Sequence, residues 1–72
     1  MGLDEKIDKR VESFDVILNE DCTQIKEIMD KPNDEILGNS DTIMKLKELI
    51  EEIKTISYAK FILVNKIKSK EE

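Results

Sequence analysis

The sequence predicts an all-α fold: a long antiparallel helical hairpin, with three helices as the alternative, that pairs into a dimeric four-helix bundle. Two segments of nearly equal length carry apolar residues at helical spacing, and one breaker-rich stretch separates them. At 72 residues the chain forms a single helical domain, with arms at 3–30 and 41–68 joined by a connection at 31–41. A domain this small removes only about 60 % of its unfolded surface from water, and pairing would cover more.

The first arm has one apolar stripe, whose members follow one another at steps of three and four residues. Asp21 with Gln24 three positions on could cap a fresh helix near residues 19–21. The stripe keeps its phase through this point, so one helix is favoured over two. Cys22 continues the stripe and is therefore expected to be a small buried core residue. The stripe consists of Leu3, Ile7, Val11, Phe14, Leu18, Cys22, Ile25 and Met29.

The connection holds a proline and two apolar residues. Pro32 ends the first arm, because a residue before proline avoids helical dihedrals. Ser40 or Asp41 is the expected N-cap of the second arm. Ile36 and Leu37 are expected to fold back as one short helical turn and to plug the end of the bundle.

The second arm carries its own apolar stripe, in which Leu49, Ile56 and Leu63 recur at intervals of seven residues. This spacing is typical of a helix packed along a neighbouring helix. We expect Leu49, Ile53 and Ile56 to form the seam of the core and of the dimer. The stripe consists of Ile43, Leu46, Leu49, Ile50, Ile53, Ile56, Leu63 and Ile67.

The run from Phe61 to Val64 is apolar at four consecutive positions and ends in a β-branched residue. Such a run fits a buried strand as well as a helix, and helix is favoured here for residues 58–64. On a helix the run would be apolar nearly all round, which marks a contact surface. The predicted partner-binding residues are Tyr58, Phe61, Ile62, Leu63 and Val64.

The composition argues against catalysis and against most ligands. The chain has no histidine, one arginine and one cysteine, so neither a Cys/His zinc site nor an internal disulfide can form. Cys22 lies beside Glu20 and Asp21, which disfavour a reactive thiolate. The net charge of −5 argues against nucleic-acid binding. We expect no enzyme, cofactor, metal, small-molecule substrate or membrane span, and a cytoplasmic location.

The sequence therefore predicts a non-catalytic protein–protein interaction or regulatory module that acts as a small helical homodimer. The alternative is a monomeric three-helix adaptor or an acidic inhibitor that binds a basic partner surface. Residues 1–30 favour the alternative, because they carry nine acidic and four basic side chains. The two differ in salt dependence, since apolar pairing resists salt and charge pairing does not.

Overall fold

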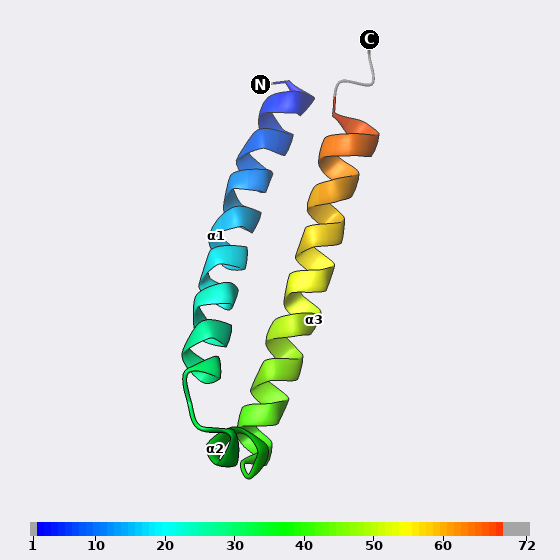
Figure 1. Ribbon diagram of the computed structural model, residues 1–72. Coiled ribbons are helices and arrows are strands. Elements are labelled where there is room, and N and C mark those ends of the chain that lie inside the picture. Colours follow the sequence, from blue (N-terminus) through cyan, green and yellow to red (C-terminus); the bar gives the residue numbers. More distant parts are fainter. Residues whose placement is uncertain (1, 69–72) are drawn as a thin grey trace.

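The computed structural model describes residues 2–68, and it is an all-α hairpin (Figure 1). Helix α1 spans Leu3–Met29, the short helix α2 spans Asn33–Leu37, and α3 spans Ser40–Ile62. A π-helical turn, η1, continues α3 over Leu63–Ile67. The two long helices lie side by side and antiparallel, with α2 at the closed end of the hairpin. The predicted all-α hairpin is confirmed.

Two alternatives left open by the sequence are now decided. The region 58–64 is helical, since α3 runs through it into η1, and no strand occurs between residues 2 and 68. The first arm is one unbroken helix of 27 residues, so Asp21 starts no second helix. In η1 the backbone N–H of Lys68 donates to the carbonyl oxygen of Leu63 at 2.9 Å, the five-residue spacing of a π-helix.

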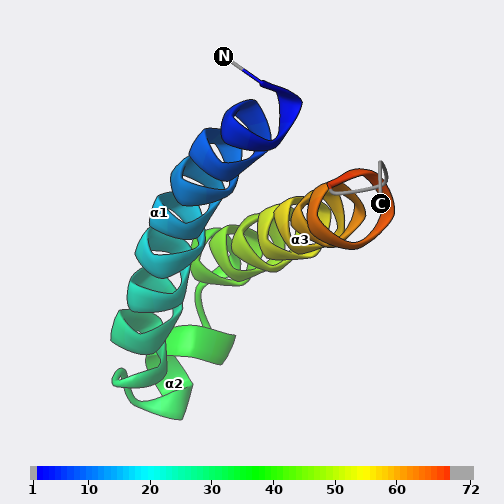
Figure 2. The same cartoon turned by 90° about the horizontal axis from the view of Figure 1, so that it is seen from above.

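The molecule is a rod of 54 × 16 × 14 Å with a radius of gyration of 16.3 Å. A compact domain of this length has a radius of gyration of about 11 Å. Figure 2 shows the two long helices from above, inclined to each other. Because the rod is only two helices wide, each long helix has one partner and leaves both flanks of the seam uncovered.

The core is a thin seam between α1 and α3. Of the described residues, three apolar ones are buried in it: Ile7 and Ile28 from α1 and Leu49 from α3. Ile53 and Ile56, the other two residues of the predicted seam, are half-buried. Burial of a large apolar side chain contributes about 1.5–3 kcal/mol, so these three buried residues contribute much of the hairpin's stability.

The expectation that Cys22 is buried is wrong: its side chain is exposed, and Asp21 lies in the seam instead. The reason is the period of the contact. Ile7, Phe14, Asp21 and Ile28 follow one another at seven-residue intervals, the repeat that keeps one helix face toward a neighbouring helix. The stripe predicted from steps of three and four residues reaches Cys22, which lies off the helix face that contacts α3.

The N-cap of α3 also differs from the prediction. Asn39 caps the helix, and its Oδ1 accepts hydrogen bonds from the backbone N–H of Asp41 at 2.9 Å and of Thr42 at 3.3 Å. Asparagine ranks with serine and aspartate as an N-cap residue. The expected caps, Ser40 and Asp41, lie inside the first turn of the helix.

The short helical turn expected in the connection forms as α2, with Pro32 as its N-cap residue. Ile36 is half-buried, but Leu37 is 74 % exposed, so the expectation that both plug the end of the bundle is wrong for Leu37. The turn after α2 requires Gly38. A Cβ added there would lie 2.7 Å from the carbonyl oxygen of Asp34.

Candidate functional site

One flank of the seam carries apolar side chains from both long helices, and we call it the apolar face. Leu18 of α1 lines a shallow groove with Phe61 of α3 and Val64 of η1, which places these residues on the same flank. The polar side chains of Ser57, Lys60 and Asn65 complete the lining. Helical spacing extends the flank along both helices. The apolar face consists of Val11, Leu18, Ile25, Ile43, Leu46, Ile50, Ile53, Phe61 and Val64.

The α3 half of the apolar face is well exposed to solvent. Ile43, Ile50, Phe61 and Val64 are each 40–49 % exposed. The Nζ atom of Lys66 lies 6.0 Å from the centroid of the Phe61 ring, a cation–π distance. The face therefore presents a row of large side chains along α3, with a lysine over its one aromatic ring.

The structure separates the five predicted partner-binding residues. Phe61 and Val64 line the groove with Leu18. Tyr58 is 66 % exposed but does not line that groove, and Ile62 and Leu63 are half-buried. The predicted surface thus contributes two of its residues to the apolar face, and the rest of that face comes from residues outside it.

Two ion pairs tie the end of α3 and η1 to α1. Lys60 Nζ lies 2.6 Å from Asp15 Oδ1, and Lys68 Nζ lies 2.5 Å from Asp8 Oδ1. The hydrogen bond to Asp8, followed by the negative charge of Asp8, raises the pKa of Lys68. All four side chains are about one-third or more exposed, so the pairs are open to screening by salt.

The opposite flank of the seam is polar, and we call its central hollow the acidic groove. The groove has a volume of about 380 Å³ and lies between α1 and α3. Four of its lining side chains are carboxylates and one is a lysine, a net charge of −3. The acidic groove is lined by Ile17, Glu20, Asp21, Gln24, Lys45, Glu48, Leu49 and Glu52.

Asp21 is the unusual member of the acidic groove. Its side chain is 4 % exposed, and its Oδ2 is buried without a hydrogen-bond partner among the described residues. Glu52 of α3 is its neighbour across the seam. The pKa of Glu52 is raised, first by the hydrogen bond its protonated carboxyl makes with Asp21 and then by the charge of Asp21. Two ionised carboxylates cannot form that bond, since both only accept.

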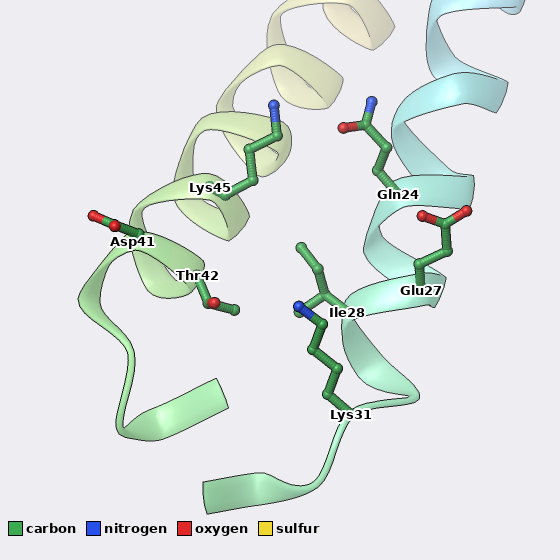
Figure 3. Close-up of a pocket in the computed structure, with 7 residues that line it drawn as sticks. All are labelled: Gln24, Glu27, Ile28, Lys31, Asp41, Thr42 and Lys45. Atoms are coloured by element: carbon green, nitrogen blue, oxygen red, sulfur yellow. The ribbon is translucent and has the colours of Figure 1, made fainter. Parts of the chain in front are cut away.

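A second groove continues the first toward the closed end of the hairpin (Figure 3). It shares Gln24 and Lys45 with the acidic groove and also includes Glu27, Lys31 and Asp41. Figure 3 shows Gln24 and Lys45 projecting from opposite helices, while Asp41 points away from the gap. The polar flank therefore carries two connected grooves rather than a single isolated cavity.

Sequence reasoning missed the Asp21–Glu52 pair, because the two carboxylates lie on different helices and no spacing rule connects them. One signal could have found Asp21. The seven-residue repeat recognised in Leu49, Ile56 and Leu63 also runs through α1, where its third member is Asp21. A charged residue at a seam position is a candidate for a special role, because burial of an unpaired charge is costly.

Comparison with known proteins adds no assignment. No family model matches the chain, and no curated protein or solved structure matches it. Among residues 2–68, no helix combines the length and the apolar character that a membrane crossing requires. The function must therefore be inferred from the two flanks of the hairpin.

Proposed function

We propose that the protein is a non-catalytic interaction or regulatory module that acts as a homodimer, in which the apolar faces of two hairpins pair into a four-helix bundle. The observation that carries the proposal is the exposure of large apolar side chains along one flank, Ile43, Ile50, Phe61 and Val64. Several large apolar side chains exposed on one flank of a small protein indicate an interaction site.

The accessible surface supports pairing on quantitative grounds. The hairpin exposes 5667 Å², whereas a compact chain of 8.4 kDa exposes about 4600 Å². The excess of roughly 1000 Å² is comparable with the 800 Å² or so that each partner buries in a standard-size interface. A second copy is the simplest occupant, because identical apolar faces meet self-complementarily about a two-fold axis.

The non-catalytic part of the proposal rests on the side-chain inventory. The chain has no histidine to act as a base and a single arginine. Its one cysteine is exposed on α1 and follows directly after Glu20 and Asp21. A nucleophilic thiol needs a neighbouring base or clustered cations, and these residues offer neither.

Light scattering coupled to size exclusion, at several protein concentrations, tests the proposal. We expect a dimer mass that is unchanged between low and high salt, because apolar pairing is not screened. Ile50→Gln and Phe61→Gln should shift the mass toward monomer while helicity is retained. Met44→Gln is the matched control, since Met44 is 60 % exposed and outside the apolar face. A monomer at every concentration would overturn the homodimer.

A further inference from the structure

The acidic groove contains a buried carboxylate, Asp21, one of whose oxygens has no hydrogen-bond donor among residues 2–68. That oxygen is Oδ2, and it is buried although the residue lines an open groove. A buried carboxylate oxygen without a donor lowers stability, because it has lost its hydrogen bonds to water and nothing replaces them. A donor that enters the groove would remove this cost.

The surroundings of Asp21 favour a cation as that donor. Glu20 and Glu48 line the same groove, and Glu52 faces Asp21 from α3. Lys45 is the single basic side chain in the lining. Its charge lowers the pKa of Glu52, but by less than Asp21 raises it. The groove therefore keeps a net negative charge that attracts a second positive group.

We propose that the acidic groove is a binding site for an arginine side chain carried by a basic segment of a partner protein. The guanidinium would lie between the carboxylates of Asp21 and Glu52 and donate to both. Its five N–H donors are fixed in one plane, so it can satisfy two carboxylates at once. This site lies on the flank opposite the apolar face and does not depend on the homodimer.

Two other cations fit the groove less well. A lysine ammonium is a compact and strongly hydrated point charge, so it is less suited than a planar guanidinium to bridging two carboxylates on different helices. Calcium takes six to eight oxygen ligands. Among residues 2–68, no group of three or more Asp, Glu, Cys or His side chains is placed to hold a metal ion.

The shape of the flank argues for a segment of protein rather than a free small molecule. The acidic groove opens into the second groove through their shared residues, Gln24 and Lys45 (Figure 3). The second groove adds the carboxylate of Glu27 and the ammonium group of Lys31, which together add no net negative charge. A segment of the partner could therefore place one arginine at Asp21 and lay uncharged neighbours along the second groove.

Fluorescence anisotropy of a labelled octa-arginine peptide, titrated with the full chain at low salt, tests the inference. We expect binding that Asp21→Asn and Glu52→Gln each weaken by about tenfold, the effect of losing one charge-assisted hydrogen bond. Glu51→Gln is the matched control, because it removes the same charge from the neighbouring position, outside the groove lining. It should weaken binding by less than about twofold.

Five results would overturn the inference. Four concern the peptide: an equal loss in Glu51→Gln and Glu52→Gln, equal affinity for an octa-lysine peptide, displacement of the peptide by low concentrations of calcium, and absence of binding. The fifth is self-association at low salt that Arg10→Gln abolishes, since the groove would then bind the arginine of a second copy. If a variant misfolds, NMR of the unmodified chain replaces it, with the side-chain carboxyl ¹³C shifts of Asp21 and Glu52 as the measurement. These shifts should move on peptide addition.

The outcome is distinguishable from failure of the homodimer. The mass measurement reports on the apolar face, and the peptide titration reports on the opposite flank. A monomeric hairpin that binds octa-arginine through Asp21 would support this inference and rule out the homodimer. A dimer that does not bind octa-arginine would support the homodimer and rule out this inference.

Discussion

Lys60 of α3 donates a hydrogen bond of 2.6 Å from its Nζ to Oδ1 of Asp15 of α1, across 45 positions of sequence. The pair lies next to the groove that Leu18, Phe61 and Val64 line, since Lys60 is part of the same lining. The ion pair therefore joins α1 and α3 beside the apolar groove, next to the proposed dimer interface.

Replacing Lys60 with glutamine should lower the free energy of unfolding by less than about 1 kcal/mol, because the pair is partly exposed and solvent screens it. The loss should shrink as salt is added. Urea titrations of both proteins at low and high salt measure this effect. Lys47→Gln is the control, as an exposed lysine on the same helix. A loss that is independent of salt would contradict the assignment.

The stability of the hairpin should fall as pH rises above the ordinary glutamate range. The pKa of Glu52 is raised in the folded state, so the folded chain holds a proton that the unfolded chain releases. The contribution is fully present below the unfolded pKa and is lost as pH rises through the folded one. Around this carboxyl, Asp21 and Glu20 raise the pKa and Lys45 lowers it.

Thermal melts of the protein and of Glu52→Gln at a series of mildly acidic and neutral pH values measure this dependence. The variant cannot ionise at this position, so its Tm should fall less steeply with pH. Parallel Tm curves for the two proteins would show that the Glu52 carboxyl is not the source of the pH dependence. Glu51→Gln should retain the full pH dependence.

Truncation of Leu49 should be the most damaging single change in α3. Leu49 is 4 % exposed, and replacing a buried leucine with alanine costs about 2–5 kcal/mol. Its neighbour Ile50 is 44 % exposed, so Ile50→Ala should cost less in a dilute monomer. Circular dichroism melts of both variants compare the two costs. Equal Tm losses would place the seam elsewhere.

The Asn39 cap should be worth about 1 kcal/mol, the usual cost of replacing an N-cap asparagine with alanine. Asn39→Ala leaves the backbone N–H groups of Asp41 and Thr42 without their acceptor. Asn39→Asp supplies a similar acceptor and should restore most of the stability. Urea denaturation of the three proteins gives the comparison. No difference between alanine and aspartate would contradict the capping role.

Much of the fold could be read from the sequence, because apolar spacing and one breaker-rich stretch define two long helices. The details that depend on close packing could not. Steps of three and four allowed Cys22 to continue the stripe, whereas contact along a neighbouring helix follows a strict seven-residue repeat and selects Asp21. Asn39 and Ser40 are both good caps, and only the geometry of the turn decides between them.

The candidate site was less predictable than the fold. Glu52 and Asp21 are 31 positions apart in sequence, and the antiparallel register that brings them together follows from the length of the connection. Phe61 and Val64 were recognisable as contact residues from their apolar run. Leu18 joins them only because α1 passes that point of α3.

The hairpin is closed in two unlike ways, and this should give it a gradient of backbone protection. At one end α2 and the covalent connection hold the long helices together. At the other end no covalent link among the described residues joins the helices, which are held by burial of Ile7 and by the Lys68–Asp8 ion pair at the end of the π-turn. Fraying should therefore begin at that end and travel toward α2. Amide hydrogen exchange should be fastest near Asp8 and Lys68, should quicken there with added salt, and should be slowest around Leu49.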